Sequence, residues 1–184
     1  GDTVVTQGGL IGKIAKVEDN ELQIDTLVIN SNKDGIEGSL SKNKIYLDTE
    51  KYKSIEKAFK NITIELSAII ESYTNIYIVL GFGGDCGTRV INILHQAIKD
   101  KDIIIKVIGV MPFNYEGTAR KKKALDTVIK TKSLYKELKL FENQSLFKAA
   151  NNNTTFLEAF KFMDFNIFSF IKNNKWHELA SIGL

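Results

Sequence analysis

A short apolar run that passes directly into a glycine-rich loop is the strongest structural signal in this chain: Ile76-Tyr77-Ile78-Val79-Leu80-Gly81-Phe82-Gly83-Gly84-Asp85-Cys86-Gly87-Thr88. Five apolar residues in succession are typical of a strand that is buried on both faces, as in a parallel sheet. Residues 90–98, after the loop, have the amphipathic spacing of a helix. The stretch therefore predicts a strand, a glycine turn and a helix in direct succession.

The glycine loop also predicts a phosphate-binding site. Glycines let the backbone adopt positive φ and approach a ligand closely, and the N–H groups and dipole of the following helix attract anions. The hydroxyl of Thr88 could reach a phosphate or its metal ion. The loop lacks the G-K-[ST] of a P-loop, and Cys86 breaks the dinucleotide pattern G-x-G-x-x-G. Phosphate binding is favoured, and a tight turn that holds no ligand stays open as the alternative.

The rest of the pattern predicts one domain, residues 1–184, in which strands alternate with helices. Apolar strand patterns lie at 3–6, 22–29, 76–80 and 103–110, and a further strand ends near Leu47. Helical spacings lie at 9–16, 52–73, 90–98, 118–138 and 157–171. This alternation is typical of βαβ units, so the predicted class is α/β: a Rossmann-like, doubly wound, mainly parallel sheet flanked by helices. Ligands of such folds bind at the carboxyl ends of the strands.

The composition is that of an ordinary globular protein and argues against several classes. The formal net charge of +3 is too small to suggest nucleic acid, and the basic run at 120–123 is interpreted as a solvated helix face. The single cysteine, Cys86, cannot form an internal disulfide and fits a reducing compartment. No stretch approaches the ~20 apolar residues of a membrane span, and no signal peptide is evident, so we expect a cytoplasmic protein.

A second glycine cluster lies near the N-terminus, at Gly8, Gly9 and Gly12. By itself it fits a plain turn as well as it fits a ligand loop. Two such loops at the ends of different strands could line one phosphate cleft.

Four segments, in order, resemble motifs of the FtsZ/tubulin family. Residues 81–88 resemble its glycine-rich tubulin signature, and 111–120 (MPFNYEGTAR) resemble the segment P-F-x-F-E-G-x-x-R. Residues 142–146 (ENQSL) resemble the P-N-D-x-L element, and 156–164 (FLEAFKFMD) resemble the start of the central helix. Four ordered motifs are more specific than any one of them. The resemblance implies the nucleotide-binding domain of that family and is firmest over residues 76–171.

The resemblance further implies a site for GTP or GDP, with Mg²⁺ as an accompanying ion. The phosphates would be cradled by Gly81, Gly83, Gly84, Gly87 and Thr88. The first glycine loop would correspond to Gly8, Gly9 and Gly12, and the loop after the second strand would begin at Asn30. The remaining implied contacts are Glu116 with the ribose, Arg120 with the phosphates, Asn143 and Asp164 with the edge of the guanine, and Phe160 with its face.

The residue types suit these roles. A carboxylate such as Asp164 can accept hydrogen bonds from N1–H and the 2-amino group of guanine, which adenine does not offer. An aromatic ring stacks on a base at ~1–3 kcal/mol, and an arginine makes a charge-assisted contact to phosphate. Without the resemblance, each has an ordinary explanation: Phe160 as core, Asp164 as a surface residue or cap, and Arg120 as part of a solvated run.

The chain also departs from the family pattern. Asp85, Cys86 and Arg89 stand where the signature has glycine, threonine and glycine. Asp85 puts negative charge beside the expected phosphates, which is unfavourable unless it faces away or holds a cation; Arg89 could offset it. In the family, a loop at this point of the chain contacts the γ-phosphate. Here the loop after Leu47 is very short, so the family's loop is expected to be missing. The family's second, activation domain is expected to be absent, so little GTP hydrolysis is expected of the chain alone.

Three functions follow from these observations. The first is a guanine-nucleotide-binding protein linked to cytoskeletal filaments or cell division, whose partners would be itself or a filament-forming FtsZ-like protein. The second is a degenerate, nucleotide-free fold that acts as a protein-interaction module, which Asp85 and the missing loop favour. The third, least supported, is an unrelated enzyme with Cys86 as nucleophile, activated at a helix N-terminus.

Overall fold

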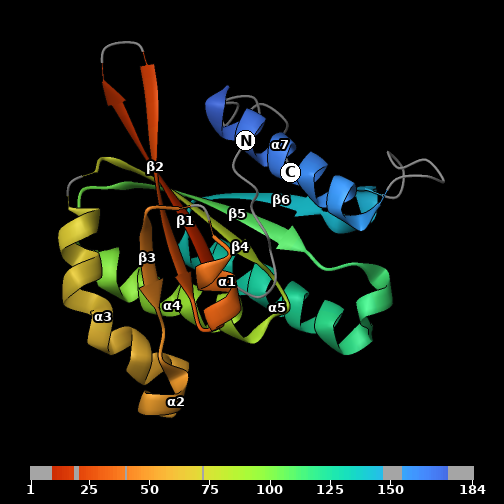
Figure 1. Ribbon diagram of the computed structural model, residues 1–184, viewed down its shortest axis with the longest axis horizontal. Coiled ribbons are helices and arrows are strands. Elements are labelled where there is room, and N and C mark those ends of the chain that lie inside the picture. Colours follow the sequence, from red (N-terminus) through yellow and green to blue (C-terminus); the bar gives the residue numbers. More distant parts are fainter. Residues whose placement is uncertain (1–9, 19–20, 40, 72, 147–154, 174–184) are drawn as a thin grey trace.

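The computed structural model describes residues 10–18, 21–39, 41–71, 73–146 and 155–173, and its centre is a six-stranded sheet (Figure 1). The strands lie in the order β3-β2-β1-β4-β5-β6. Their bounds are β1 Leu10–Glu18, β2 Glu21–Asn30, β3 Asn43–Tyr46, β4 Asn75–Gly81, β5 Ile104–Met111 and β6 Glu137–Glu142. β1 is antiparallel to β2 and β4, and the other three pairs are parallel. All strands except β1 therefore run in one direction.

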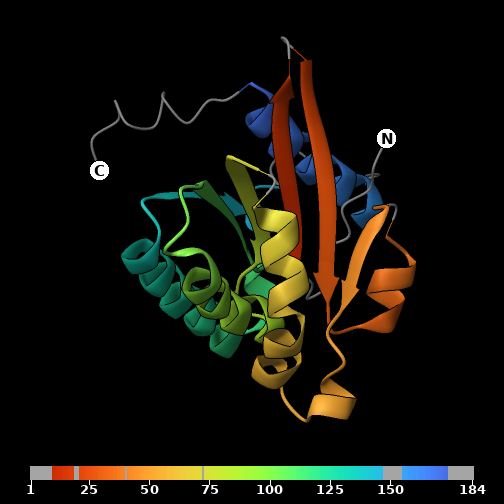
Figure 2. The same cartoon turned by 90° about the vertical axis from the view of Figure 1, so that its left-hand side faces the viewer.

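Helices cover both faces of this sheet (Figures 1 and 2). One face carries α3 Ile55–Ile70, α4 Asp85–Ile98 and α5 Thr118–Leu134, and the other carries α7 Phe156–Lys172. The shorter elements are α1 Lys33–Glu37, α2 Thr49–Tyr52, η1 Asn114–Glu116 and η2 Asn143–Ser145. The predicted class, a Rossmann-like α/β fold with a mainly parallel sheet flanked by helices, is confirmed. No helix in the described part of the chain is long and apolar enough to cross a membrane.

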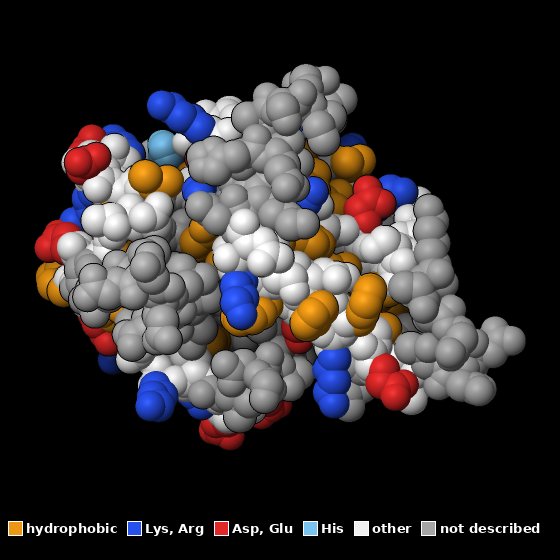
Figure 3. Space-filling view, turned by 90° about the horizontal axis from the view of Figure 1, so that it is seen from above, with side chains coloured by type: hydrophobic (Ala, Val, Ile, Leu, Met, Phe, Trp, Pro, Cys, Tyr) orange, Lys and Arg blue, Asp and Glu red, His pale blue; other side chains and the backbone are white. Residues whose placement is uncertain are grey.

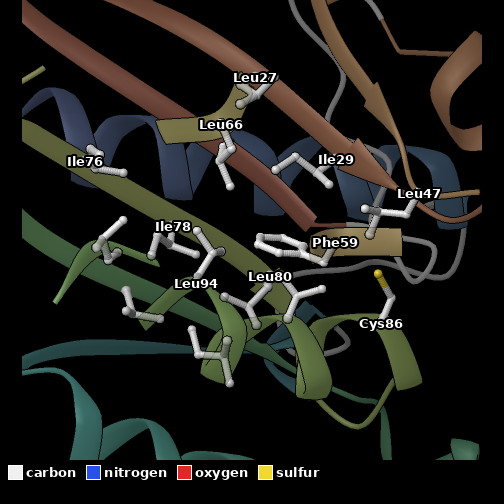
Figure 4. Packing of buried hydrophobic residues seen from close by; sticks show 14 of the residues in the cluster. Leu27, Ile29, Leu47, Phe59, Leu66, Ile76, Ile78, Leu80, Cys86 and Leu94 are labelled. Carbon is white, nitrogen blue, oxygen red and sulfur yellow. The ribbon is translucent and has the colours of Figure 1, made fainter. Parts of the chain in front are cut away.

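Both helical layers pack on β4, because side chains of a strand alternate between its two faces. Ile76, Ile78 and Leu80 belong to the core beneath α3 and α4, part of which Figure 4 shows. Tyr77 and Val79 belong to the core beneath α7. All five residues are buried, which confirms the doubly buried strand that the apolar run predicted.

α7 faces the sheet with Met163, Ile167 and Ile171, spaced four residues apart on one side of the helix. Its start and end agree with the helix predicted at 157–171. The helix begins with a capping box, in which Thr155 and Glu158 bond reciprocally to backbone N–H groups. Exposed hydrophobic side chains are visible on this side of the molecule in Figure 3. Those of α7 are Phe162, Phe165 and Phe168.

The N-terminal part of the sheet differs from the prediction. The helix predicted at 9–16 is wrong, since most of these residues form the first part of β1. The glycine loop is likewise wrong at Gly12, which lies inside β1 and pairs with Leu27 and Ile78. Gly8, Gly9 and the weak strand predicted at 3–6 lie outside the described residues.

A short connection explains why β1 is a strand of reversed direction. The register pairs Glu18 with Glu21, so only two residues link β1 to β2. Two residues can close a hairpin but cannot hold a crossover helix, and the strands must then be antiparallel. Ile11, Ile14 and Val17 have a spacing that fits a helix, but β-branched residues favour strands and a segment this short is ambiguous by spacing alone.

The chain after α5 also differs. The helix predicted at 118–138 ends at Leu134, and Tyr135 is already extended. β6 follows at Glu137–Glu142, a strand that the sequence analysis did not predict. Its polar residues alternate with Leu138 and Leu140, and it forms an edge of the sheet, where charged side chains are common. The alternation is the signal that could have revealed it.

We predict that Gly109→Ala destabilises the protein by about 1–3 kcal/mol, because overpacking a full core forces its neighbours to move. A Cβ at Gly109 in β5 would lie 2.5 Å from the ring of Phe82, which is itself buried. The free energy of unfolding in urea measures the effect. Gly81→Ala is the matched control, since its Cβ would meet nothing within 4 Å. Equal losses for the two variants would contradict the close packing of β5 on Phe82.

Candidate functional site

The loops that carry most of the predicted site residues leave the sheet at one edge, because β2, β4, β5 and β6 run in the same direction. Asn30 ends β2, Gly81 ends β4, Met111 ends β5 and Asn143 follows β6 directly. The carboxyl ends of parallel strands are where ligands bind in open α/β sheets. This edge is therefore the candidate site.

The glycine loop divides into residues needed for packing and residues that leave space. Gly83 has φ of 84°, and a Cβ there would lie 2.7 Å from the carbonyl oxygen of Arg120. A Cβ at Gly87 would lie 2.6 Å from the carbonyl oxygen of Gly81. At Gly81 and Gly84, by contrast, a Cβ would meet nothing within 4 Å. Gly84 is the N-cap residue of α4, and it makes no side-chain hydrogen bond. The first N–H groups of α4 therefore have no side-chain partner at that residue.

Thr88 is engaged in helix packing. Its hydroxyl donates to the carbonyl oxygen of Gly84 at 2.7 Å and lies 3.1 Å from the hydroxyl of Thr127 on α5. These contacts tie the first turn of α4 to its neighbouring helix. A phosphate contact from this hydroxyl, as the resemblance implied, would require it to leave the carbonyl of Gly84.

A carboxylate stands at the N-terminus of α4. Asp85 begins the helix, and its side chain forms an ion pair with Lys123 of α5. The hydrogen bond and charge of Lys123 lower the pKa of Asp85 below its ordinary value, with smaller contributions from Arg89 and Arg120. Of the two possibilities given by the sequence, that Asp85 faces away or that it holds a cation, the structure has the second. The cation is Lys123, which had been interpreted as part of a solvated run. Asp85 also faces the positive end of the helix dipole, where negative charge is stabilised.

The two arginines of this region also have acidic partners. Arg89 lies 3.1 Å from Glu56 of α3. It therefore balances the negative charge of Asp85 only slightly, although the sequence had predicted that role for it. Arg120 lies 2.9 Å from one carboxylate oxygen of Glu116. The other oxygen of Glu116 accepts a hydrogen bond from the backbone N–H of Phe113 at 2.7 Å. Glu116 therefore holds the turn after β5 in shape as well as orienting Arg120.

The loop after β6 contains a buried polar group without a partner. Asn143 is only 7% exposed, and its side-chain Oδ1 has no hydrogen-bond partner. No other buried side-chain nitrogen or oxygen of the described residues shares this condition. A buried acceptor left unpaired costs about 1–3 kcal/mol. Such groups in folded proteins call for an explanation, and a ligand that donates a hydrogen bond to the group is one.

α7 lies over the same edge. Phe160 contacts Phe113 edge to face, with ring centroids 5.9 Å apart. Phe113 and Leu146, which follow β5 and β6, share a core cluster with the neighbouring turn of α7. Asp164, one turn after Phe160, is 8% exposed. A carboxylate this buried is uncommon, because removing charge from water is unfavourable.

The remaining predicted residues have structural roles. Asn30 is buried, and its Oδ1 accepts a hydrogen bond from the N–H of Asn32 at 3.0 Å, which shapes the turn after β2. Cys86 is buried and belongs to the same core cluster as Phe59 and Leu47 (Figure 4), which speaks against its use as an exposed nucleophile. Sequence reasoning missed Gln144, whose Oε1 accepts from the N–H of Asn114 at 3.1 Å and joins the loops after β5 and β6. Within the described residues, no cluster of three or more His, Cys, Asp or Glu side chains could hold a metal ion.

Comparison with known sequences places the chain near one family. No protein-family model matches it. The cell division protein FtsZ of Rickettsia felis is 29% identical over 147 residues, which cover 75% of this chain and 32% of the relative. FtsZ of Bartonella bacilliformis is 32% identical over 94 residues, or 51% of this chain and 16% of the relative. The chain spans about a third of the Rickettsia felis protein.

Solved structures share the fold. An empty FtsZ dimer from M. jannaschii superposes with a TM-score of 0.66 at 24% identity, over 78% of this chain and 44% of that one. A GDP-bound monomer of CetZ1 from Haloferax volcanii gives 0.63 at 15% identity, over 77% and 47%. The fold is thus that of FtsZ-like nucleotide-binding domains. With the sequence matches, this makes the chain a distant homologue of the FtsZ/tubulin family.

We predict that Lys123→Met raises the pKa of Asp85 toward its ordinary value near 4, because the main cause of its lowering is removed. The side-chain carboxyl resonance of Asp85, titrated by NMR, measures this. Since the folded-state pKa is lowered, the ion pair stabilises the fold above about pH 4 and this contribution is lost as the pH falls through the folded-state value. Both groups are partly exposed, so the stability lost is at most about 1 kcal/mol.

The matched control for this titration is Lys122→Met, one position earlier on the same helix. No ion pair of the described residues includes Lys122. The pKa of Asp85 should not change in this variant. An equal rise in both variants would mean that the general positive field of α5, and not the contact with Lys123, sets the pKa.

Proposed function

We propose that the chain binds a guanine nucleotide, GTP or GDP, at the carboxyl edge of the sheet, with the base against Asn143, Phe160 and Asp164. The observation that carries this proposal is the unpartnered Oδ1 of Asn143, which is buried. A ligand with a hydrogen-bond donor at that point would remove the cost of leaving the acceptor unpaired. Family membership supports the same edge, and the related CetZ1 of Haloferax volcanii is a GDP-bound monomer.

Guanine suits the chemistry of this end of the site. Its N1–H and 2-amino group are donors, and both Oδ1 of Asn143 and the carboxylate of Asp164 are acceptors. Adenine presents only its 6-amino donor on the corresponding edge, so a site made of acceptors discriminates against it. A site built to bond a polar group rejects analogues that lack it more strongly than an apolar pocket rejects a misfit. The ring of Phe160, already beside Phe113, could contact the face of the base.

The phosphate end has weaker support. The N-terminus of α4, with open space beside Gly81 and Gly84, suits an anion. Asp85 disfavours a bound anion there, because its carboxylate already lies at the positive end of the helix dipole. Arg120 could turn from Glu116 to a phosphate. We therefore propose that the base contributes most of the affinity, and that any Mg²⁺ is held largely by phosphate oxygens, as is usual for nucleotide sites.

The second candidate is a protein-interaction module that binds no nucleotide. It is favoured by the satisfied charges around α4, where Asp85 pairs with Lys123 and Arg120 with Glu116. It is also favoured by β1, a strand that lies where a helix after the first glycine loop was predicted. Under either candidate, association with itself or with a filament-forming FtsZ-like protein in the cytoplasm, in a role linked to cell division, remains part of the proposal.

Titration of the wild-type chain with fluorescent analogues of GTP, GDP and ATP tests the choice between the candidates. We expect GTP and GDP to bind at least about tenfold more tightly than ATP, since one lost hydrogen bond to a charged group is worth about 1.5–3 kcal/mol. Equal affinity for ATP would contradict the assignment of the base-binding residues. If no nucleotide binds, the interaction module replaces the nucleotide-binding proposal.

The variant Asp164→Ala should weaken guanine-nucleotide binding by roughly 10–150-fold, the equivalent of one hydrogen bond to a charged group. Lys122→Ala is the control, because this exposed lysine lies on α5 and outside the proposed contacts. Asn143→Ala adds a test that separates binding from folding. This variant should weaken nucleotide binding. It loses no hydrogen bond at Oδ1, because that atom accepts none, so the free energy of unfolding should not fall on that account. Equal nucleotide affinity in all three variants would mean that the nucleotide binds elsewhere on the chain or does not bind.

A further inference from the structure

α5 carries its larger apolar side chains on the outside. The residues that it buries against the sheet and α4 are mostly small or polar: Ala124, Thr127, Val128 and Thr131. The hydroxyl of Thr127 can donate to the carbonyl of Lys123, and that of Thr131 to the carbonyl of Thr127, which satisfies both groups inside the core. Leu125 and Ile129, one turn apart, point outward and are 48% and 70% exposed. Core packing does not account for these two side chains.

The same outer face is strongly basic. α5 has six lysine and arginine residues and a single acidic one, Asp126, although the whole chain has a formal net charge of only +3. The rest of the chain is therefore net negative, and the positive charge is concentrated on this helix. Within the described residues, Lys122, Lys130 and Lys132 belong to no ion pair. Lys123 and Arg120, by contrast, are paired with Asp85 and Glu116.

The outer face of α5 is convex, and α5 is the last helix of its layer. It packs beside α4, on β5 and β6, and lies at the outside of the molecule (Figure 2). Peptides that dock through apolar anchors lay them into a groove between elements. α5 is a single helix whose outer face carries two apolar side chains flanked by lysines and by the exposed Asp126. This convex face suits a flat partner.

We propose that this face, formed by Leu125 and Ile129 with Lys122, Lys130 and Lys132, docks on the surface of an anionic lipid bilayer. Charge complementarity favours that partner, because each lysine near an anionic surface strengthens binding by about fivefold. α5 then lies parallel to the membrane, with Leu125 and Ile129 at the boundary between headgroups and acyl chains. The lysines extend to the lipid phosphates while their methylene stems cover the apolar pair. With only two inserted side chains the binding is reversible.

Flotation of the whole chain with vesicles tests the proposal. We expect binding to vesicles of phosphatidylcholine with phosphatidylglycerol, none to phosphatidylcholine alone, and a marked loss as salt is raised to 0.5 M. The variant Leu125→Ser/Ile129→Ser should weaken binding at least tenfold. The variant Lys122→Glu/Lys130→Glu/Lys132→Glu should weaken it at least a hundredfold, from about fivefold for each of three lost lysines.

Two control variants change the same residue types away from this face. Ile64→Ser alters an isoleucine of α3 that is 86% exposed, and Lys60→Glu reverses an exposed lysine of the same helix. Both should bind vesicles like the wild type, and the thermal unfolding midpoint reports that each variant is folded. Failure of the wild type to bind anionic vesicles, or equal losses in the α3 and α5 variants, would overturn the proposal. Binding of an acidic amphipathic peptide in place of vesicles would also overturn it and assign the face to a protein partner. Nucleotide affinity does not enter any of these outcomes.

Discussion

β4 has no face toward solvent, and this two-sided burial governs how the helices and loops around it are arranged. Ile76, Ile78 and Leu80 pack under the helices of one layer while Tyr77 and Val79 pack under α7. At the carboxyl end of this enclosed strand, the chain has to turn sharply to enter α4. The turn brings backbone against backbone, and a Cβ at Gly87 would be 2.6 Å from the carbonyl oxygen of Gly81. The sharp turn therefore requires glycine at Gly83 and Gly87, whatever the loop binds, whereas packing does not require it at Gly81 or Gly84.

The same constraint explains why the two ends of the candidate site differ. At the proposed phosphate end, the charges brought together by α4 and α5 satisfy one another, as in the pairs of Asp85 with Lys123 and Arg120 with Glu116. At the other end, the core under α7 encloses the polar side chains of Asn143 and Asp164 and leaves Oδ1 of Asn143 without a partner. Exposed ion pairs contribute little to stability and can exchange partners, whereas a buried unpaired acceptor has a steady cost. The proposed base end is thus where a ligand would change the free energy most.

α5 illustrates how hydroxyl groups alter the meaning of a helical pattern. Its apolar residues have the spacing of an ordinary amphipathic helix, yet Leu125 and Ile129 are exposed while Thr127 and Thr131 are buried. A threonine in a helix can donate to the carbonyl four residues earlier, which removes most of the cost of burying it. The threonines fit beside α4, where the hydroxyl of Thr127 lies 3.1 Å from that of Thr88. The larger side chains of α5 are then left on the surface among lysines.

The sequence alone predicts the class of fold, the doubly buried β4, the glycine turn and a resemblance to the FtsZ/tubulin family, because each rests on a local pattern: an apolar run, a glycine-rich loop, and motifs in order. It did not determine β1, since a β-branched segment with helical spacing becomes a strand only when a two-residue link forces a hairpin with β2. It did not reveal β6, whose alternating pattern is short and follows a helix without a break. The tertiary structure alone decided that Lys123 holds Asp85, that Thr88 faces α5 and that Asn143 lacks a partner. These features depend on contacts between side chains of different elements. Asp85 and Lys123, for example, are 38 residues apart in the sequence, and no local pattern indicates such a contact.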